Sequence, residues 1–124
     1  MSAEIIYCFM VIRNQLKIYH WQTHSFSRHK ASDDLIDKID DNIDSFVEVY
    51  IGKYGRPTFK SKTSSLKLEN FDDKQAPQFV ERAIKWLSET LPKHLDSKKD
   101  TDLLNIRDEM LGNLNQTLYL FELK

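Results

Sequence analysis

The chain has 124 residues, which is enough for one domain built around one buried core. Lys and Arg total 18 and Asp and Glu total 19, so the net charge of -1 provides no overall field that would attract nucleic acid or an anionic membrane. With Gly 3 and Pro 3, there are too few turn-forming residues for a many-stranded β protein, and we expect an all-α fold.

Two amphipathic helices are predicted in the first half of the chain. Apolar residues three and four positions apart predict a helix from about Ala3 to Thr23. Its stripe is Ile5, Phe9, Ile12, Leu16 and Tyr19. A second helix is expected from about Ser27 to Gly55, where Gly55, Arg56 and Pro57 break the pattern. Its stripe is Leu35, Ile39, Ile43, Phe46, Tyr50 and Tyr54.

The second half is predicted to contain a long connection and two further helices. Residues Thr58 to Lys74 have no sustained periodicity and form the connection. A short third helix has Pro77 in its first turn and is ended or kinked by Pro92, with a stripe of Val80, Ala83, Ile84, Leu87 and Leu91. Asp100 is expected to cap the last helix, whose stripe is Leu103, Ile106, Met110, Leu114, Leu118 and Phe121. Two short links and one long crossover are typical of a ferritin-like four-helix bundle, here a single domain over residues 1–124.

An acidic stripe follows one side of the predicted second helix. Its members, at helical spacing, are Asp33, Asp37, Asp40, Asp44 and Glu48, and His29 lies one turn before them. Such a stripe can simply face solvent, but a solvated helix normally intersperses lysines, and here Lys38 alone interrupts the acidic residues. His29 with Asp33, and Asp44 with Glu48, therefore each resemble half of a divalent metal site.

These half-sites cannot share a metal within one chain. Asp33 and Asp44 are about 16 Å apart along a helix axis. A second copy packed antiparallel about a twofold axis near Lys38 would place His29 and Asp33 of one chain opposite Asp44 and Glu48 of the other. This arrangement gives two equivalent metal positions roughly 20 Å apart, and the aspartates near the axis then need neutralisation.

His20 is a further candidate ligand, at the end of the predicted first helix. The short link that follows it would bring its imidazole beside the start of the second helix. Trp21 would then be an aromatic residue next to the site. His24 and His94 have no carboxylate at a spacing that completes a site, and both are expected on the surface.

The run from Leu16 to Trp21 and the residues after it resemble the Dps family of mini-ferritins, the DNA-binding proteins from starved cells. In that family a His-Trp pair closes the first helix, and a second histidine is followed by acidic residues at the spacings of Asp33, Asp44 and Glu48. The resemblance implies a ferroxidase centre between twofold-related subunits, with Trp21 beside the iron. Its ligands would be His20, His29, Asp33, Asp44 and Glu48. The two histidines are closer in sequence than in the family, which makes His20 the weakest predicted ligand.

The function implied by this resemblance is oxidation of Fe(II), with hydrogen peroxide as the favoured oxidant, and storage of Fe(III) that protects against oxidative damage. The family forms a hollow twelve-subunit shell, so a homo-oligomer is implied. Alternatives are a structural or interaction module that holds zinc without turnover, or a DNA-protecting relative, although strong nucleic-acid binding is not expected. A di-iron oxygenase is disfavoured, because no histidine has a glutamate three residues before it.

A cytoplasmic location is expected. The first residues, Met1 to Glu4, lack the basic and apolar regions of a signal peptide. No stretch approaches the roughly 20 apolar residues of a membrane span.

Cys8 is the single cysteine, and its apolar neighbours indicate a buried hydrophobic residue and not a reactive thiol.

Overall fold

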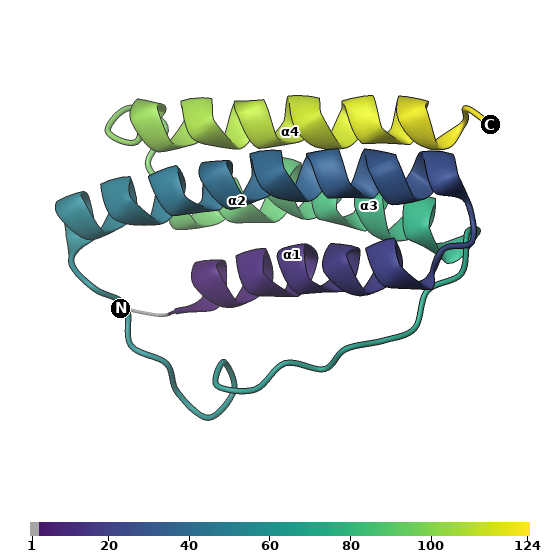
Figure 1. Cartoon of the computed structure of the whole chain (residues 1–124). Helices are drawn as coiled ribbons and strands as arrows, with labels where there is room; N and C mark the ends of the chain where they lie inside the picture. The colour runs from purple at the N-terminus through teal and green to yellow at the C-terminus, as the bar shows by residue number, and fades with distance from the viewer. Residues whose placement is uncertain (1–2) are drawn as a thin grey trace.

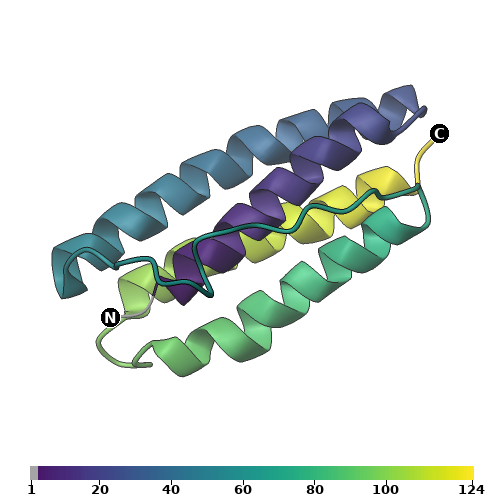
Figure 2. The same cartoon turned by 90° about the horizontal axis from the view of Figure 1, so that it is seen from below.

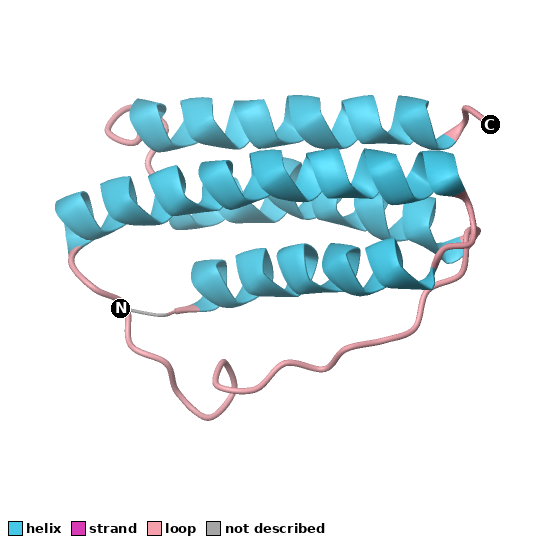
Figure 3. Ribbon diagram, in the orientation of Figure 1, coloured by secondary structure: helices cyan, strands magenta, loops and turns pink. Residues whose placement is uncertain are grey.

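The computed structural model describes residues 3–124, which form an all-α bundle without any strand. The helices are α1 (Glu4–Gln22), α2 (Phe26–Tyr54), α3 (Gln75–Lys85) and α4 (Thr101–Phe121). Figure 3 shows the helices joined by two short links and one long connection. Met1 and Ser2, part of the segment on which the expectation about a signal peptide rests, lie outside the described residues.

The helices form two antiparallel pairs, α1 with α2 and α3 with α4 (Figure 1). The connection over residues 55–74 returns along the length of the bundle, as Figure 2 shows most clearly. Helix α2 packs against α1 and α4, and α3 packs against α4 and α1. The predicted all-α bundle with short links inside each pair and a long crossover between pairs is therefore confirmed.

The predicted apolar stripes meet in one core. All five predicted stripe residues of α1 are buried, and Phe9 makes edge-to-face contacts with Phe46 and Trp86 at ring-centroid distances of 5.0 and 5.7 Å. The second stripe is less regular, because Ile43 is half-buried and Tyr54 is exposed. The exposure of Tyr54 fits its position in the last turn of α2, which extends beyond α1 and α4 (Figure 1).

Side-chain caps fix two helix starts. Ser25 accepts a hydrogen bond from the Arg28 N–H, so α2 begins slightly earlier than predicted. At α3, Asp72 Oδ1 accepts from the Gln75 N–H at 2.8 Å, and Gln75 Oε1 accepts from the Asp72 N–H at 3.0 Å. This reciprocal capping box ends the crossover.

The second half of the crossover is held against α1 by hydrogen bonds. The Gln15 side chain, buried against the crossover, donates to the Glu69 carbonyl at 2.7 Å and accepts from the Glu69 N–H at 2.8 Å. One turn later, the Tyr19 hydroxyl donates to Asp73 at 2.7 Å. Polar groups on one face of α1 therefore serve as hydrogen-bond partners for the crossover, through the backbone of Glu69 and the side chain of Asp73.

The end of the third helical segment departs from α geometry. After α3 the chain forms a π-helical turn at Trp86–Thr90 and a 3-10 turn at Leu91–His94, so the predicted disruption at Pro92 is a change of helix type. The Leu91 N–H bonds the Trp86 carbonyl, and Pro92 has no N–H to offer the Leu87 carbonyl. The Arg107 guanidinium of α4 donates to that carbonyl at 3.0 Å.

Asp100 precedes α4 as predicted, but its side chain does not cap the helix. The carboxylate is 1% exposed and accepts hydrogen bonds from the Asp96 N–H at 2.7 Å and the Tyr54 hydroxyl at 2.5 Å. Lys53 lies 3.1 Å from the same carboxylate. The residue therefore ties the α3–α4 link to the end of α2.

No helix within residues 3–124 is long and apolar enough to cross a membrane. Cys8 is half-buried and not fully buried as predicted, and burial, aided by the charge of Glu4, raises the pKa of its thiol to about 11. The thiol is therefore protonated at neutral pH, as the interpretation of Cys8 as unreactive requires.

Candidate metal centre

The link over residues 23–25 brings His20 of α1 and His29 of α2 into direct contact. Their rings stack with centroids 3.8 Å apart and an interplanar angle of 19°. His20 is buried, with 6% of its surface exposed, and His29 is exposed. The short link therefore does not separate the two predicted ligands.

Each imidazole is held by the backbone of the other residue. Nδ1 of His20 lies 2.8 Å from the His29 carbonyl oxygen, and Nδ1 of His29 lies 2.9 Å from the His20 carbonyl oxygen. Because a carbonyl oxygen only accepts, both Nδ1 atoms donate, and in the neutral rings the lone pairs lie on Nε2. Metal-binding histidines in proteins are typically fixed in this way.

Ser32 and Asp33 complete the surroundings of His20. The Ser32 Oγ, which is buried, lies 3.1 Å from His20 Nδ1. Asp33 places a carboxylate oxygen 4.0 Å from His20 Nε2 on the solvent side. Two ligands of one metal normally lie about 3 to 3.4 Å apart, so a small side-chain rotation would let both atoms bind one ion.

The other two predicted ligands are not brought to this position. Asp44 and Glu48 are exposed and lie further along α2, which is one uninterrupted helix. At about 1.5 Å per residue, Asp44 lies about 16 Å from Asp33 along the axis. Within residues 3–124 there is no group of three or more His, Cys, Asp or Glu side chains placed to hold a metal. A complete site would therefore need ligands from outside the chain.

Between the two groups of predicted ligands, Arg13 of α1 neutralises part of the acidic stripe. Its guanidinium donates to both carboxylate oxygens of Asp40, at 2.9 and 3.3 Å, and this hydrogen bonding raises the pKa of Arg13 above its ordinary value. Lys38 instead turns toward α4, where it donates to Gln116 at 3.2 Å. Sequence reasoning missed Arg13, because nothing in the spacing along α2 reveals a partner on another helix.

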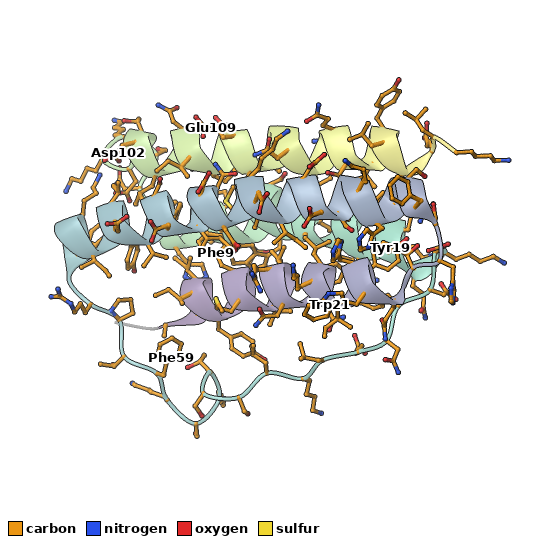
Figure 4. The ribbon with its side chains drawn as sticks, viewed as in Figure 1. Phe9, Tyr19, Trp21, Phe59, Asp102 and Glu109 are labelled. Atoms are coloured by element: carbon orange, nitrogen blue, oxygen red, sulfur yellow. The ribbon has the colours of Figure 1, made fainter. Side chains whose placement is uncertain are left out.

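Two large aromatic residues lie exposed near the histidines. Trp21 is 65% exposed at the end of α1 (Figure 4), with the Lys17 ammonium 5.3 Å from its ring centroid. Phe26 is 75% exposed at the start of α2. His24 and His94 are exposed, as predicted.

Comparison with known proteins identifies a family. Residues 20–121 match the model of Family of unknown function (DUF5856). The chain belongs to this family. It is also 28% identical, over 105 residues, to a protein of Enterobacteria phage T4 described as "Uncharacterized 14.6 kDa protein in mobD-ri intergenic region". That alignment covers 85% of this chain and 75% of the phage protein. No solved structure matches the chain.

The expected membership of the Dps family is wrong, because the family model and the relative that match carry neither a Dps nor a ferritin description. The resemblance depended on a few residues at particular spacings, and such spacings can arise by chance. Six aspartates lie between residues 33 and 44, so a required Asp spacing is easily met by chance. The geometry of the histidine pair does not depend on that resemblance, since it comes from the hydrogen bonds described above.

Proposed function

We propose that the protein is a ferritin-like bundle that binds divalent metal, principally Fe(II), at two equivalent sites of a twofold dimer. The ligands would be His20, His29 and Asp33 of one chain, with Asp44 and Glu48 of the other. The observation that carries this proposal is the pair of stacked imidazoles fixed through Nδ1, of which His20 has its Nε2 atom 4.0 Å from the Asp33 carboxylate.

The donor set suits the metal. Imidazole nitrogens and carboxylate oxygens bind Fe(II) and Zn(II) well, and an imidazole whose Nδ1–H donates to a carbonyl group has Nε2 as its metal-binding nitrogen. Three carboxylates would stabilise Fe(III) more than Fe(II), because the product carries one more positive charge. The protein residues thereby favour oxidation of bound Fe(II). With hydrogen peroxide as the proposed oxidant, two Fe(II) ions and two protons would convert one peroxide into two water molecules, and the Fe(III) product would then be sequestered.

The need for a second copy follows from the distance between the half-sites. A copy of α2 packed antiparallel across the acidic stripe would place each histidine half-site opposite a partner's Asp44 and Glu48, roughly 20 Å from the symmetry-related site. The bidentate contact of Arg13 with Asp40 reduces repulsion near the axis. Exposed Trp21 and Phe26 provide apolar surface for such an interface.

The test combines metal content, mass and iron oxidation. Wild-type protein should be a dimer or larger assembly with about one metal per chain, and it should consume peroxide while ferric absorbance develops. Asp44→Asn with Glu48→Gln should abolish oxidation, because these changes remove two carboxylates and preserve side-chain shape. The matched control, Asp34→Asn with Asp41→Asn, removes the same charge from exposed positions of α2 outside the ligand set.

Two outcomes would contradict the proposal. One is a monomer that retains iron, and the other is oxidation at the wild-type rate by the Asp44 and Glu48 double variant. Zinc binding at the same residues without iron oxidation would instead support the alternative of a structural or interaction module, because the donor set itself accepts either metal.

A further inference from the structure

We infer that Ser32 is a positioning residue that, together with the His29 carbonyl, holds the orientation and proton placement of His20, and this inference rests on the proposed metal site. Ser32 lies in the second turn of α2, directly before Asp33, and is 0% exposed. Its Oγ is 3.0 Å from the His29 carbonyl oxygen and 3.1 Å from His20 Nδ1. The hydroxyl therefore lies between the two predicted histidine ligands.

The direction of each hydrogen bond follows from the chemistry of the groups. The His29 carbonyl can only accept, so the Ser32 hydroxyl donates its proton to that oxygen. The Ser32 lone pairs then face the His20 Nδ1–H, which is shared with the same carbonyl at 2.8 Å. A serine can both donate and accept here, whereas alanine could do neither.

This contact differs from the ordinary hydrogen bond of a helical serine to its own backbone. Such a bond is local to one helix, but Ser32 also receives a donor from α1. Because His20 is buried, its Nδ1–H cannot turn to water without moving the ring. Ser32 thus joins the orientation of a side chain on α1 to the backbone of α2.

The two histidines are consequently unequal. Nδ1 of His20 has two acceptors, the His29 carbonyl and Ser32 Oγ, whereas the hydrogen bond of His29 Nδ1 is to the His20 carbonyl. His20 is the preset ligand, with its Nε2 lone pair available on the side of Asp33. His29 is exposed, and its Nδ1 is not bonded to Ser32.

The first experiment uses protein without metal. Nitrogen-15 spectra of the imidazole groups should report His20 protonated at Nδ1 in the wild type. In Ser32→Ala, the share of His20 protonated at Nε2 should increase. Ser45→Ala removes an exposed hydroxyl from the same helix and should leave the spectrum of His20 unchanged. An unchanged His20 tautomer in folded Ser32→Ala would overturn the inference whether or not the protein binds metal.

The second experiment titrates the same proteins with Co(II), whose visible absorbance reports binding. Ser32→Ala should bind about 10-fold more weakly or worse, as is typical when a residue that orients a ligand is lost. Ser32→Thr keeps the hydroxyl and should restore Nδ1 protonation and most of the affinity, which would support the inference even if Ser32→Ala folds poorly. Equal Co(II) affinity of Ser32→Ala and wild type would overturn the inference about Ser32 but not the proposed metal site. Wild-type protein that binds no Co(II) would overturn the proposed site itself.

Discussion

The carboxylate of Asp100 joins three parts of the chain, and its environment makes stability depend on pH. Burial alone would raise the pKa of this carboxyl, but the hydrogen bonds that it accepts outweigh burial and hold the pKa below its ordinary value of 3.8. A depressed pKa in the folded state means that the stabilisation is present above the unfolded-state pKa. It is lost as the pH falls through the folded-state pKa.

Replacing Asp100 with Ala should lower the free energy of unfolding by about 2 to 3 kcal/mol at pH 7, because the Tyr54 hydroxyl and the Asp96 N–H lose their acceptor. The difference from wild type should shrink below pH 4. Urea unfolding at pH 7 and pH 3 measures both values. Asp34→Ala, at an exposed position of α2, serves as the control and should change stability little. A difference that is the same at both pH values would contradict this account.

Residues on the apolar stripes could be predicted from sequence, since burial follows periodicity within one helix. Asp100 was placed correctly before α4, but its partners belong to α2 and to the preceding link. Arg13 and Ser32 were missed for the same reason, because their roles depend on side chains of another helix. For the candidate site, spacing along α2 predicts candidate ligands, which stay a prediction, and only the packing of α1 on α2 shows how His20 is held.

At the scale of elements, the π-helical turn leaves a backbone carbonyl without a donor in its own helix, and a side chain of α4 supplies one. Arg107 supplies the Leu87 carbonyl with the donor that Pro92 lacks. We expect Arg107→Leu to destabilise the wild type by about 1 to 2 kcal/mol. In a Pro92→Ala background the cost should be smaller, because that substitution restores a backbone N–H at this position. A double-mutant cycle measured by urea unfolding gives the coupling, and additive effects would contradict this explanation.

The crossover depends on α1 for its order. Gln15→Ala would leave the backbone of Glu69 without its two partners, so we expect a loss of about 1 to 3 kcal/mol. Trypsin should then cleave faster after Lys60, Lys62 and Lys67, which lie on the connection. The control is Gln116→Ala, which removes an exposed partner of Lys38. Equal cleavage of the Gln15 variant and the wild type would show that other contacts hold the crossover.

The number, order and approximate limits of the helices could be predicted, because long amphipathic stripes and Gly or Pro breaks are strong signals. The change from α to π geometry could not be predicted, because it depends on a hydrogen bond that the Arg107 side chain of α4 donates to the Leu87 carbonyl oxygen. The path of the crossover could not be predicted either, because its sequence has no apolar periodicity. It is fixed by Gln15, which an apolar pattern does not reveal, and by the hydroxyl group of Tyr19, a residue that the pattern predicts only as part of the core.

For the whole molecule, Trp21 can report the proposed assembly. The chain has two tryptophans, and Trp86→Phe leaves Trp21 as the single fluorophore of its kind while retaining an aromatic ring against Phe9. Trp21 is exposed in the isolated chain, so its emission should shift to shorter wavelength as concentration or metal drives dimer formation. Sedimentation on the same samples gives the mass. Dimers with a fully exposed Trp21 would place the interface elsewhere.

The mutually hydrogen-bonded histidines also have a consequence for the order in which the chain folds. All their hydrogen-bond partners lie within residues 20–33, so bringing the rings together closes only a short loop and costs little chain entropy. Proteins rich in contacts of low sequence separation fold fast, because such contacts require little loop closure. We therefore expect the α1–α2 hairpin to bring the two histidines together before the crossover and the second helix pair are in place, so that a nascent chain would already carry this part of the proposed site.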